Sequence, residues 1–193
     1  MTPITSLQEI QQLFYQRGGE QYSGEQVTQL EHALQTAFLA EQAGENDALI
    51  TAALLHDLGH LLHNLGDTPS LHGVDDAHQH SAVTALRGLF DAPVLQAIAL
   101  HVDAKRYLCV TDPTYLKKLS ADSQRSLALQ GGAFSLVQAK SFVAQAHASA
   151  AVRLRIWDDL AKSRALTTPP LTHFLNYARR CMNPTLTTEL VTA

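Results

Sequence analysis

The residues best suited to chemistry are His56 and Asp57, adjacent in the apolar segment Ala53–His60, which reads ALLHDLGH. Burying ionisable side chains in an apolar helix is costly unless they are paired or bound to a metal ion. Neighbouring positions on a helix lie about 100° apart, so this pair can approach one ion from adjacent directions. The second carboxylate oxygen of Asp57 can then bridge to another ion. The alternative is a buried Asp57 satisfied by a neighbouring donor.

Further candidate ligands lie on both sides of this pair. His32 precedes it and Asp158 follows it, and these four residues would suffice for one ion. His80 begins an apolar-periodic segment, and His101 ends an apolar stripe that places it on a buried face. Each of these two could instead be a satisfied core histidine. Six ligands would give each of two ions three or four donors, and imidazole with carboxylate suits iron, manganese or zinc. The predicted ligands are His32, His56, Asp57, His80, His101 and Asp158.

The elements that must position these residues are helices. Capping residues, apolar repeats at helical spacing and Gly or Pro breaks recur along the chain, and no strand-like alternation of useful length appears. Ser6 caps the first expected helix and Ser23 with Gln26 opens the second. The others are expected from Asp47 to Leu62, over 78–90, 93–103, 133–148 and 149–162, and from Pro169 to Asn183, with a surface loop over 66–77 and a less regular region over 107–132. We expect an all-α fold, a single helical bundle over 1–193 with its core at about 22–165.

Composition narrows the function classes. The 193 residues fit one domain, and 46% apolar with 17% charged residues is ordinary for a folded protein. A net charge of -4 argues against nucleic-acid binding, and no apolar run approaches the roughly 20 residues of a membrane span. Nothing near the N-terminus reads as a signal peptide. Cys109 and Cys181 are expected to be free thiols in a reducing cytoplasm, so the expected location is cytoplasmic.

The order of His32, the His56-Asp57 pair and Asp158 resembles the HD-domain superfamily of helical metal-dependent enzymes. Within it, a series of motifs resembles the phosphonate-cleaving oxygenases. The motifs are Tyr22–Glu25 (YSGE), Gln29–His32 (QLEH), Leu54–His60 (LLHDLGH), Gln79-His80, His101–Leu108 (HVDAKRYL), Leu129–Gly132 (LQGG) and Arg155–Asp158 (RIWD). The resemblance runs from Tyr22 to about Lys162.

This resemblance implies a mixed-valent Fe(II)/Fe(III) pair with O2 as co-substrate. The implied reaction is oxidative cleavage of the carbon-phosphorus bond of a 1-hydroxyethylphosphonate with an ammonium or trimethylammonium group at C2. It would give glycine or glycine betaine plus phosphate, downstream of a phosphonate hydroxylase. Two alternatives stay open: a two-metal HD phosphohydrolase acting on a nucleotide or other phosphate ester, and a non-catalytic HD binding module.

Several further side chains then acquire expected roles. Lys105, one turn after His101, and Arg155, three residues before Asp158, would bind the phosphonate together with His60. The resemblance suggests that Tyr22 covers an open iron position before substrate binds and that Glu25 pairs with the amine. Each could instead be an ordinary surface residue. Neutral hydrogen bonds are expected from Ser123, Ser126 and Gln130.

Overall fold

The structure is a computed structural model that describes residues 2–66 and 68–184. Helices account for the regular structure of this part of the chain, apart from two isolated bridges, so the predicted all-α class is confirmed. In chain order the α-helices are α1 (Leu7–Arg17), α2 (Gln29–Gln42), α3 (Asp47–Leu55), α4 (His78–Leu86), α5 (Ala92–Thr111), α6 (Tyr115–Lys118), α7 (Ala121–Leu129), α8 (Leu136–Val143), α9 (Ala148–Leu160) and α10 (Leu171–Arg180). Two 3-10 helices, η1 (Leu58–Leu62) and η2 (Pro69–His72), lie between α3 and α4.

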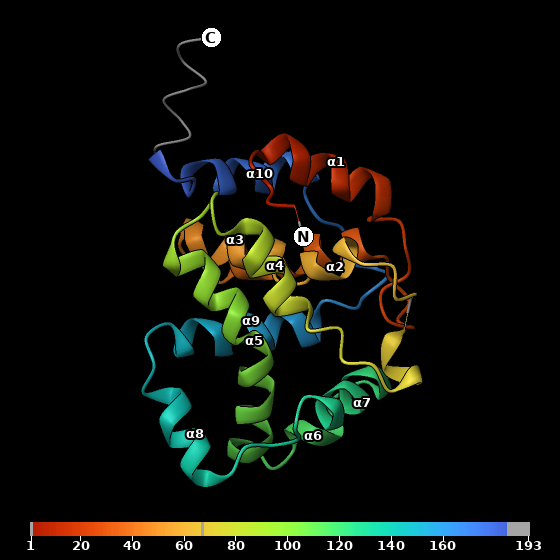
Figure 1. Cartoon of the computed structure of the whole chain (residues 1–193), viewed down its shortest axis with the longest axis vertical. Coiled ribbons are helices and arrows are strands. Elements are labelled where there is room, and N and C mark those ends of the chain that lie inside the picture. Colours follow the sequence, from red (N-terminus) through yellow and green to blue (C-terminus); the bar gives the residue numbers. More distant parts are fainter. Residues whose placement is uncertain (1, 67, 185–193) are drawn as a thin grey trace.

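Helix α3 is the centre of the molecule. It packs against α2, α5, α9 and α10, and every residue from Leu49 to Leu55 is buried. Its sequence is apolar nearly all round, which is typical of a helix enclosed by others. In Figure 1, α1 and α10 lie over the top of this central layer and α9 crosses α5 beneath it. The helix therefore delivers its C-terminal end, where His56 and Asp57 lie, into the interior.

Helix α5 extends eight residues further than Asp103, its predicted end. Beyond Asp103 the helix continues with Ala104, which forms a second buried cluster with Leu100, Phe142 and Ala151. Figure 1 shows α5 as a long rod joining the upper layer to α6, α7 and α8. One continuous helix thus carries both His101 and Lys105.

The start of α2 differs from its predicted position. The cap is Thr28, whose hydroxyl accepts from the backbone N–H of Glu31 while the Glu31 carboxylate accepts from the N–H of Thr28. This reciprocal pair satisfies two free N–H groups at once, so it outcompetes the predicted cap at Ser23. Tyr22 and Glu25 consequently lie in a loop, in which Ser23 has a positive φ of 39°.

Helix α3 also ends earlier than predicted, at Leu55 rather than Leu62. Asp57 has φ -102° and ψ 11°, outside the helical range, and the chain continues as η1. The turn presses Gly59 against the backbone of His78: a Cβ on Gly59 would lie 2.0 Å from the His78 carbonyl oxygen. The break therefore brings the HD pair and the first residue of α4 together.

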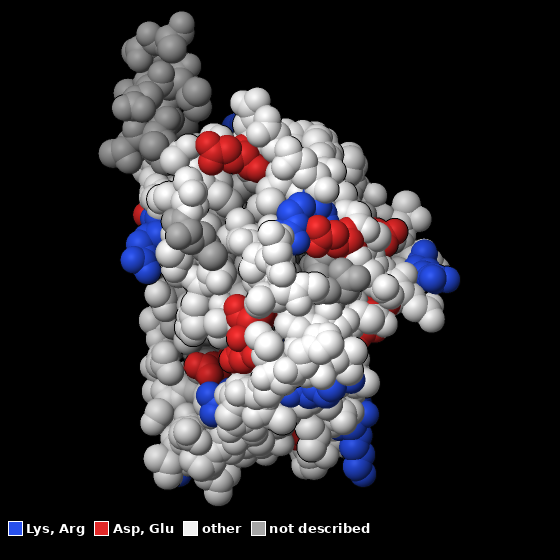
Figure 2. Space-filling view, turned by 45° about the vertical axis from the view of Figure 1, so that its right-hand side comes forward, with Lys and Arg blue, Asp and Glu red and all other residues white. Residues whose placement is uncertain are grey.

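The surface carries both signs of charge. On the face shown in Figure 2, Lys and Arg side chains alternate with Asp and Glu rather than forming one continuous patch. Among the described residues, no helix combines the length and the apolar character needed to cross a membrane.

Candidate metal centre and substrate cavity

Hydrogen bonds at Nδ1 hold the rings of four buried histidines, which lie at the end of α3 and on neighbouring helices. In three of them Nδ1 lies 2.7–2.9 Å from a backbone carbonyl oxygen, and in the fourth, His78, it lies 2.9 Å from the Asp76 carboxylate. These oxygens only accept, so each Nδ1 carries the proton and donates it. In its neutral form, each ring therefore presents a bare lone pair at Nε2. The four residues are His32, His56, His78 and His101.

Two of these lone pairs form a first group with both aspartates. Nε2 of His32 and Nε2 of His56 lie 3.3 Å apart, and Oδ2 of Asp57 lies 3.5 and 3.3 Å from them. Oδ1 of Asp158 lies 3.5 Å from Nε2 of His32. The first group therefore contains two nitrogen and two carboxylate ligands from α2, α9 and the end of α3.

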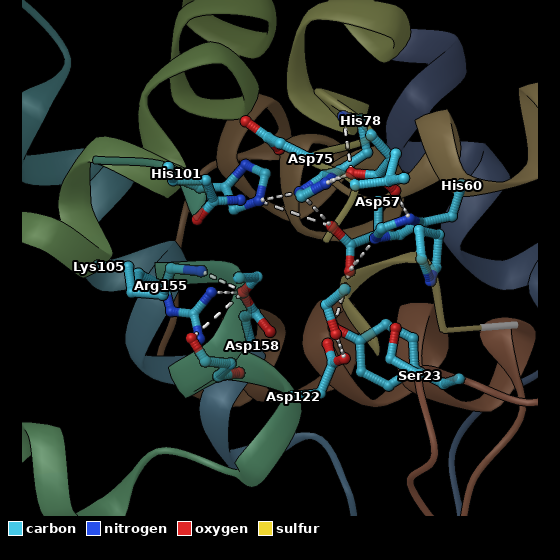
Figure 3. Close-up of a pocket in the computed structure, with 18 residues that line it drawn as sticks. Ser23, Asp57, His60, Asp75, His78, His101, Lys105, Asp122, Arg155 and Asp158 are labelled. Carbon is cyan, nitrogen blue, oxygen red and sulfur yellow. Dashed lines mark hydrogen bonds and ion pairs between the residues drawn. The ribbon is translucent and has the colours of Figure 1, made fainter. Parts of the chain in front are cut away.

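The other two lone pairs form a second group around the other oxygen of Asp57. Nε2 of His78 and Nε2 of His101 lie 3.1 Å apart, and Oδ1 of Asp57 lies 3.4 and 3.5 Å from them. Figure 3 shows Asp57 next to His78, between His101 and His60. Asp57 thus offers one carboxylate oxygen to each group.

These residues fit a metal pair. Oδ1 of Asp57 and Oδ1 of Asp158 are buried and have no hydrogen-bond partner among the described residues, which is costly without a cation. Ligands at about 2.1 Å from one ion lie about 3.0–3.4 Å apart, close to the separations within both groups. The geometry therefore suits two ions bridged by Asp57.

The structure corrects the choice of His80. Its side chain is exposed on the outer face of α4, away from both groups, whereas His78, two residues earlier, is buried in the second group. Ala82 and Ala85 follow His78 at helical spacing and are also buried, so His78 belongs to the inward stripe of α4. Five of the six predicted ligands come together as expected, and His78 takes the sixth position.

A cavity opens onto both groups and contains most of the predicted substrate residues. Nζ of Lys105 is buried and donates to Oγ of Ser126 at 2.9 Å. Figure 3 shows Lys105 and Arg155 on one side of the cavity and His60 on the other. The predicted substrate residues that line it are His60, Lys105, Ser123, Ser126, Gln130 and Arg155.

Arg155 has a structural task in addition to facing the cavity. Its Nη1 lies 2.8 Å from Oδ2 of Asp158, and its Nε donates to Oη of Tyr115 at 3.0 Å. The guanidinium also pairs with Asp159. Arg155 is therefore fixed against a ligand of the first group, while Lys105 is the less constrained cation in the cavity.

Tyr22 and Glu25 separate in space. Oη of Tyr22 donates to Oδ2 of Asp57 at 2.9 Å, and its ring stacks on His32, so Tyr22 closes the first group. Glu25 does not line the cavity; its carboxylate lies 3.0 Å from Nζ of Lys162. In this structure Glu25 is therefore outside the position that would bind a substrate amine.

The loop before α4 supplies residues that the sequence reasoning did not select. Asp76 lies 2.5 Å from Nδ1 of His60, 3.1 Å from Nε2 of His63 and 2.9 Å from Nδ1 of His78. Asp122 lines the cavity near Ser70, whose hydroxyl donates to it at 2.5 Å. A clue was available, because Asp76 lies two residues before a buried histidine, at a distance suited to a local side-chain bond.

Charges in the cavity shift the pKa values of its residues in opposite directions. Burial alone would lower the pKa of His60, but Asp57 and Asp76 outweigh it and raise that pKa to about 9. Burial, helped by the charge of Arg155, lowers the pKa of Lys105 to about 7. Burial and the neighbouring His56 hold the pKa of His101 well below its usual value. His101 is therefore neutral and able to bind a metal at neutral pH.

Comparison with known proteins places this centre in a family. Residues 30–130 match the family described as HD domain. A relative from Gimesia maris, named hydroxymethylphosphonate dioxygenase, is 41% identical over 181 residues, covering 93% of this chain and 88% of the relative. The chain belongs to the HD domain family. A second relative, from Leisingera caerulea, is 35% identical over 171 residues, covering 89% of this chain and 87% of the relative. It is named 1-hydroxy-2-(trimethylamino)ethylphosphonate dioxygenase (glycine-betaine-forming).

Both relatives are oxygenases by name, and each aligns over most of its length. This HD-domain chain is accordingly an enzyme of the oxygenase group, an oxidoreductase, as the motif series predicted. Its buried histidine and aspartate cluster suits metal ions, and O2 is the co-substrate that the group implies.

Proposed function

We propose that this HD-domain oxygenase uses two iron ions, bridged by Asp57, to cleave the carbon-phosphorus bond of a 1-hydroxyphosphonate with O2. One observation carries the proposal: two pairs of histidines place their Nε2 atoms beside the two carboxylate oxygens of Asp57. The cavity next to them is lined by Lys105 and Arg155. The ligands would be His32, His56, Asp57 and Asp158 for the first ion and Asp57, His78 and His101 for the second.

An iron pair, when bound, supplies electrons for O2 activation and Lewis acidity toward the substrate oxygens. The protein groups bind and orient the phosphonate. Lys105 and Arg155, which both line the cavity, would offer charge-assisted hydrogen bonds to its oxygens, and protonated His60 would offer another from the opposite wall. Ser126 holds the ammonium of Lys105 in place. Substrate would have to displace the Tyr22 hydroxyl from beside Asp57 to approach the first ion.

The three candidate substrates differ in the substituent on C1. Glu25 is paired with Lys162 and lies outside the cavity, so a C2 ammonium would require that ion pair to open or would meet Asp75 or Asp122 on the cavity wall. The 2-amino-1-hydroxyethyl and trimethylammonium phosphonates remain the proposed substrates. Hydroxymethylphosphonate, named for the 41% identical relative, joins them because it needs no cation site.

Each candidate gives the same kind of product. The carbon-phosphorus bond breaks, C1 gains one oxygen atom to become a carboxylate and phosphorus gains another to become phosphate, so one O2 balances the reaction. Glycine, glycine betaine and formate are the respective carbon products. A hydroxylase that installs the C1 hydroxyl is the class of enzyme that must act upstream. A cytoplasmic location remains part of the proposal.

The test compares the iron-loaded enzyme with and without O2 on all three phosphonates. Phosphate should appear only with O2, with one O2 consumed per phosphate, and zinc-loaded enzyme should be inactive. The alternative, a two-metal phosphohydrolase, needs only a metal-activated water. Phosphate release without O2, or cleavage of phosphate esters alone, would therefore refute the oxygenase proposal.

A further inference from the structure

The four histidines of the two metal groups differ in the kind of group that accepts the hydrogen bond from Nδ1. Nδ1 of His32, His56 and His101 donates to a main-chain carbonyl, which belongs to the fold and cannot be removed by substitution. Nδ1 of His78 alone among them donates to a side chain, the carboxylate of Asp76, at 2.9 Å. One negative charge therefore lies directly behind one ligand of the second group.

Asp76 is also the meeting point of a larger network. Its Oδ1 accepts from the ring of His78, while Oδ2 accepts from Nδ1 of His60 at 2.5 Å and from Nε2 of His63 at 3.1 Å. The rings of His60 and His78 stack with their centroids 4.2 Å apart. A single carboxylate thus orients a residue of the metal group and a residue of the substrate wall together.

The contacts of Asp76 are hydrogen bonds rather than a third metal site. Two ligands of one ion at bond lengths of about 2.1 Å lie about 3 Å or more apart, which is longer than the 2.5 Å between His60 and Asp76. With its Nδ1 proton donated to Asp76, His60 directs Nε2 into the cavity, 3.8 Å from Oδ2 of Asp57.

We propose that Asp76 is a positioning residue that fixes the ring of His78 for the second metal ion and the ring of His60 for the substrate. This inference rests on the proposed two-metal function. A carboxylate behind a metal-bound imidazole fixes its tautomer and raises its basicity, and its loss typically weakens metal binding about 10- to 100-fold. Because the first group contains no ligand oriented by Asp76, the effect should be confined to the second ion.

The experiment is a manganese titration of the metal-free full-length chain, followed by dialysis and electron paramagnetic resonance. The wild type should bind two Mn²⁺ ions and give the signal of a coupled pair. Asp76→Asn should bind the first ion as the wild type does and the second about 10- to 100-fold more weakly, leaving the six-line signal of an isolated ion. Asp76→Ala, which removes both acceptor oxygens, should do the same.

Two control variants separate this effect from a general loss of buried carboxylate contacts. His63→Gln removes one contact of Asp76 but leaves its bond to His78, so both ions should bind. Glu41→Gln alters another carboxylate that accepts from an imidazole, that of His173 at 2.7 Å, at the α2–α10 contact. It should also bind both ions.

Three results would overturn the inference. If Asp76→Asn binds both ions with wild-type affinity, the carboxylate is not needed for His78. If both ions weaken equally while the metal-free protein also melts earlier, Asp76 stabilises the fold instead. If the wild type binds a single ion, the two-metal function fails together with the inference.

Discussion

At the scale of single residues, Asp57 is the point on which both metal groups depend. Asp57→Ala should remove a ligand from both ions, so activity should fall by more than the roughly 100-fold typical of losing an outer partner. Asp158→Ala should weaken mainly the first ion, because the histidines that Asp158 contacts, His32 and His56, belong to the first group. Metal analysis after dialysis measures both effects, and full two-ion occupancy in Asp57→Ala would contradict the bridging assignment.

The lowered pKa of Lys105 predicts how kcat/KM depends on pH. Its pKa is lowered to about 7, chiefly by burial, so the free enzyme has a charged Lys105 below that pH and a neutral one above it. Since the charged form binds the phosphonate, kcat/KM should fall as pH rises through about 7. Lys105→Met should lower kcat/KM about 10- to 100-fold, corresponding to a charged hydrogen bond of about 1.5–3 kcal/mol.

The same substitution supplies the check on this assignment. Lys105→Met should remove the fall in kcat/KM near pH 7, while the metal content stays at the wild-type level. Arg155→Met should lose some of the first ion as well, because Arg155 holds Asp158. A fall near pH 7 that persists in Lys105→Met would assign that titration to another group.

The sequence predicted correctly those site residues that can be recognised from their neighbours in the chain. The apolar helix around His56 identified the HD pair, and the stripe on α5 identified His101. It selected His80, at the start of an apolar-periodic segment, although His78, two residues earlier, begins the inward stripe of small apolar residues. Glu25 was misplaced because its position depends on a contact with Lys162, 137 residues later in the chain.

At the scale of elements, η1 and α4 meet in a close backbone contact beside the centre. Gly59→Ala would put a Cβ 2.0 Å from the carbonyl oxygen of His78, so the start of α4 must move away. The second metal group should lose its geometry, and dialysed protein should retain about one ion. Gly88→Ala is the matched control, since a Cβ there meets nothing within 4 Å and metal binding should be unchanged.

A Gly59→Ala protein that binds two ions with wild-type affinity would show that α4 can shift without disturbing His78. Circular dichroism of the metal-free variant tests whether the helices still form. The contact is also one that the sequence could not reveal. Gly59 looks like an ordinary residue of a continuous helix, and its close approach to α4 is visible only in the structure.

Element types were more predictable than their limits. Apolar periodicity identified the long helices, because burial of one face dominates their stability. The start of α2 and the end of α3 depend on competition between caps and on tertiary contact. Those two boundaries decide where Tyr22, Glu25 and Asp57 point, so the site was less predictable than the fold.

At the scale of the whole molecule, metal binding should contribute much of the stability. Each ion at a free concentration of 100 times its dissociation constant stabilises the folded state by about 2.7 kcal/mol. For a chain of this length, 1 kcal/mol shifts Tm by about 2–4 °C, so two ions should raise Tm by about 10–20 °C. Calorimetry of the metal-free and Mn²⁺-loaded protein measures this shift; Tm values that differ by less than a few degrees would contradict it.

The order of the ligands along the chain has a consequence for biosynthesis. The second group lies within residues 57–101, whereas the first begins at His32 and ends at Asp158. During translation the second group is therefore complete on the nascent chain while Asp158 has yet to be synthesised. The first ion can acquire its full set of protein ligands only after α9 has emerged and folded against α2. In the proposed two-metal enzyme, the second position would therefore have its full set of ligands on the nascent chain before the first position does.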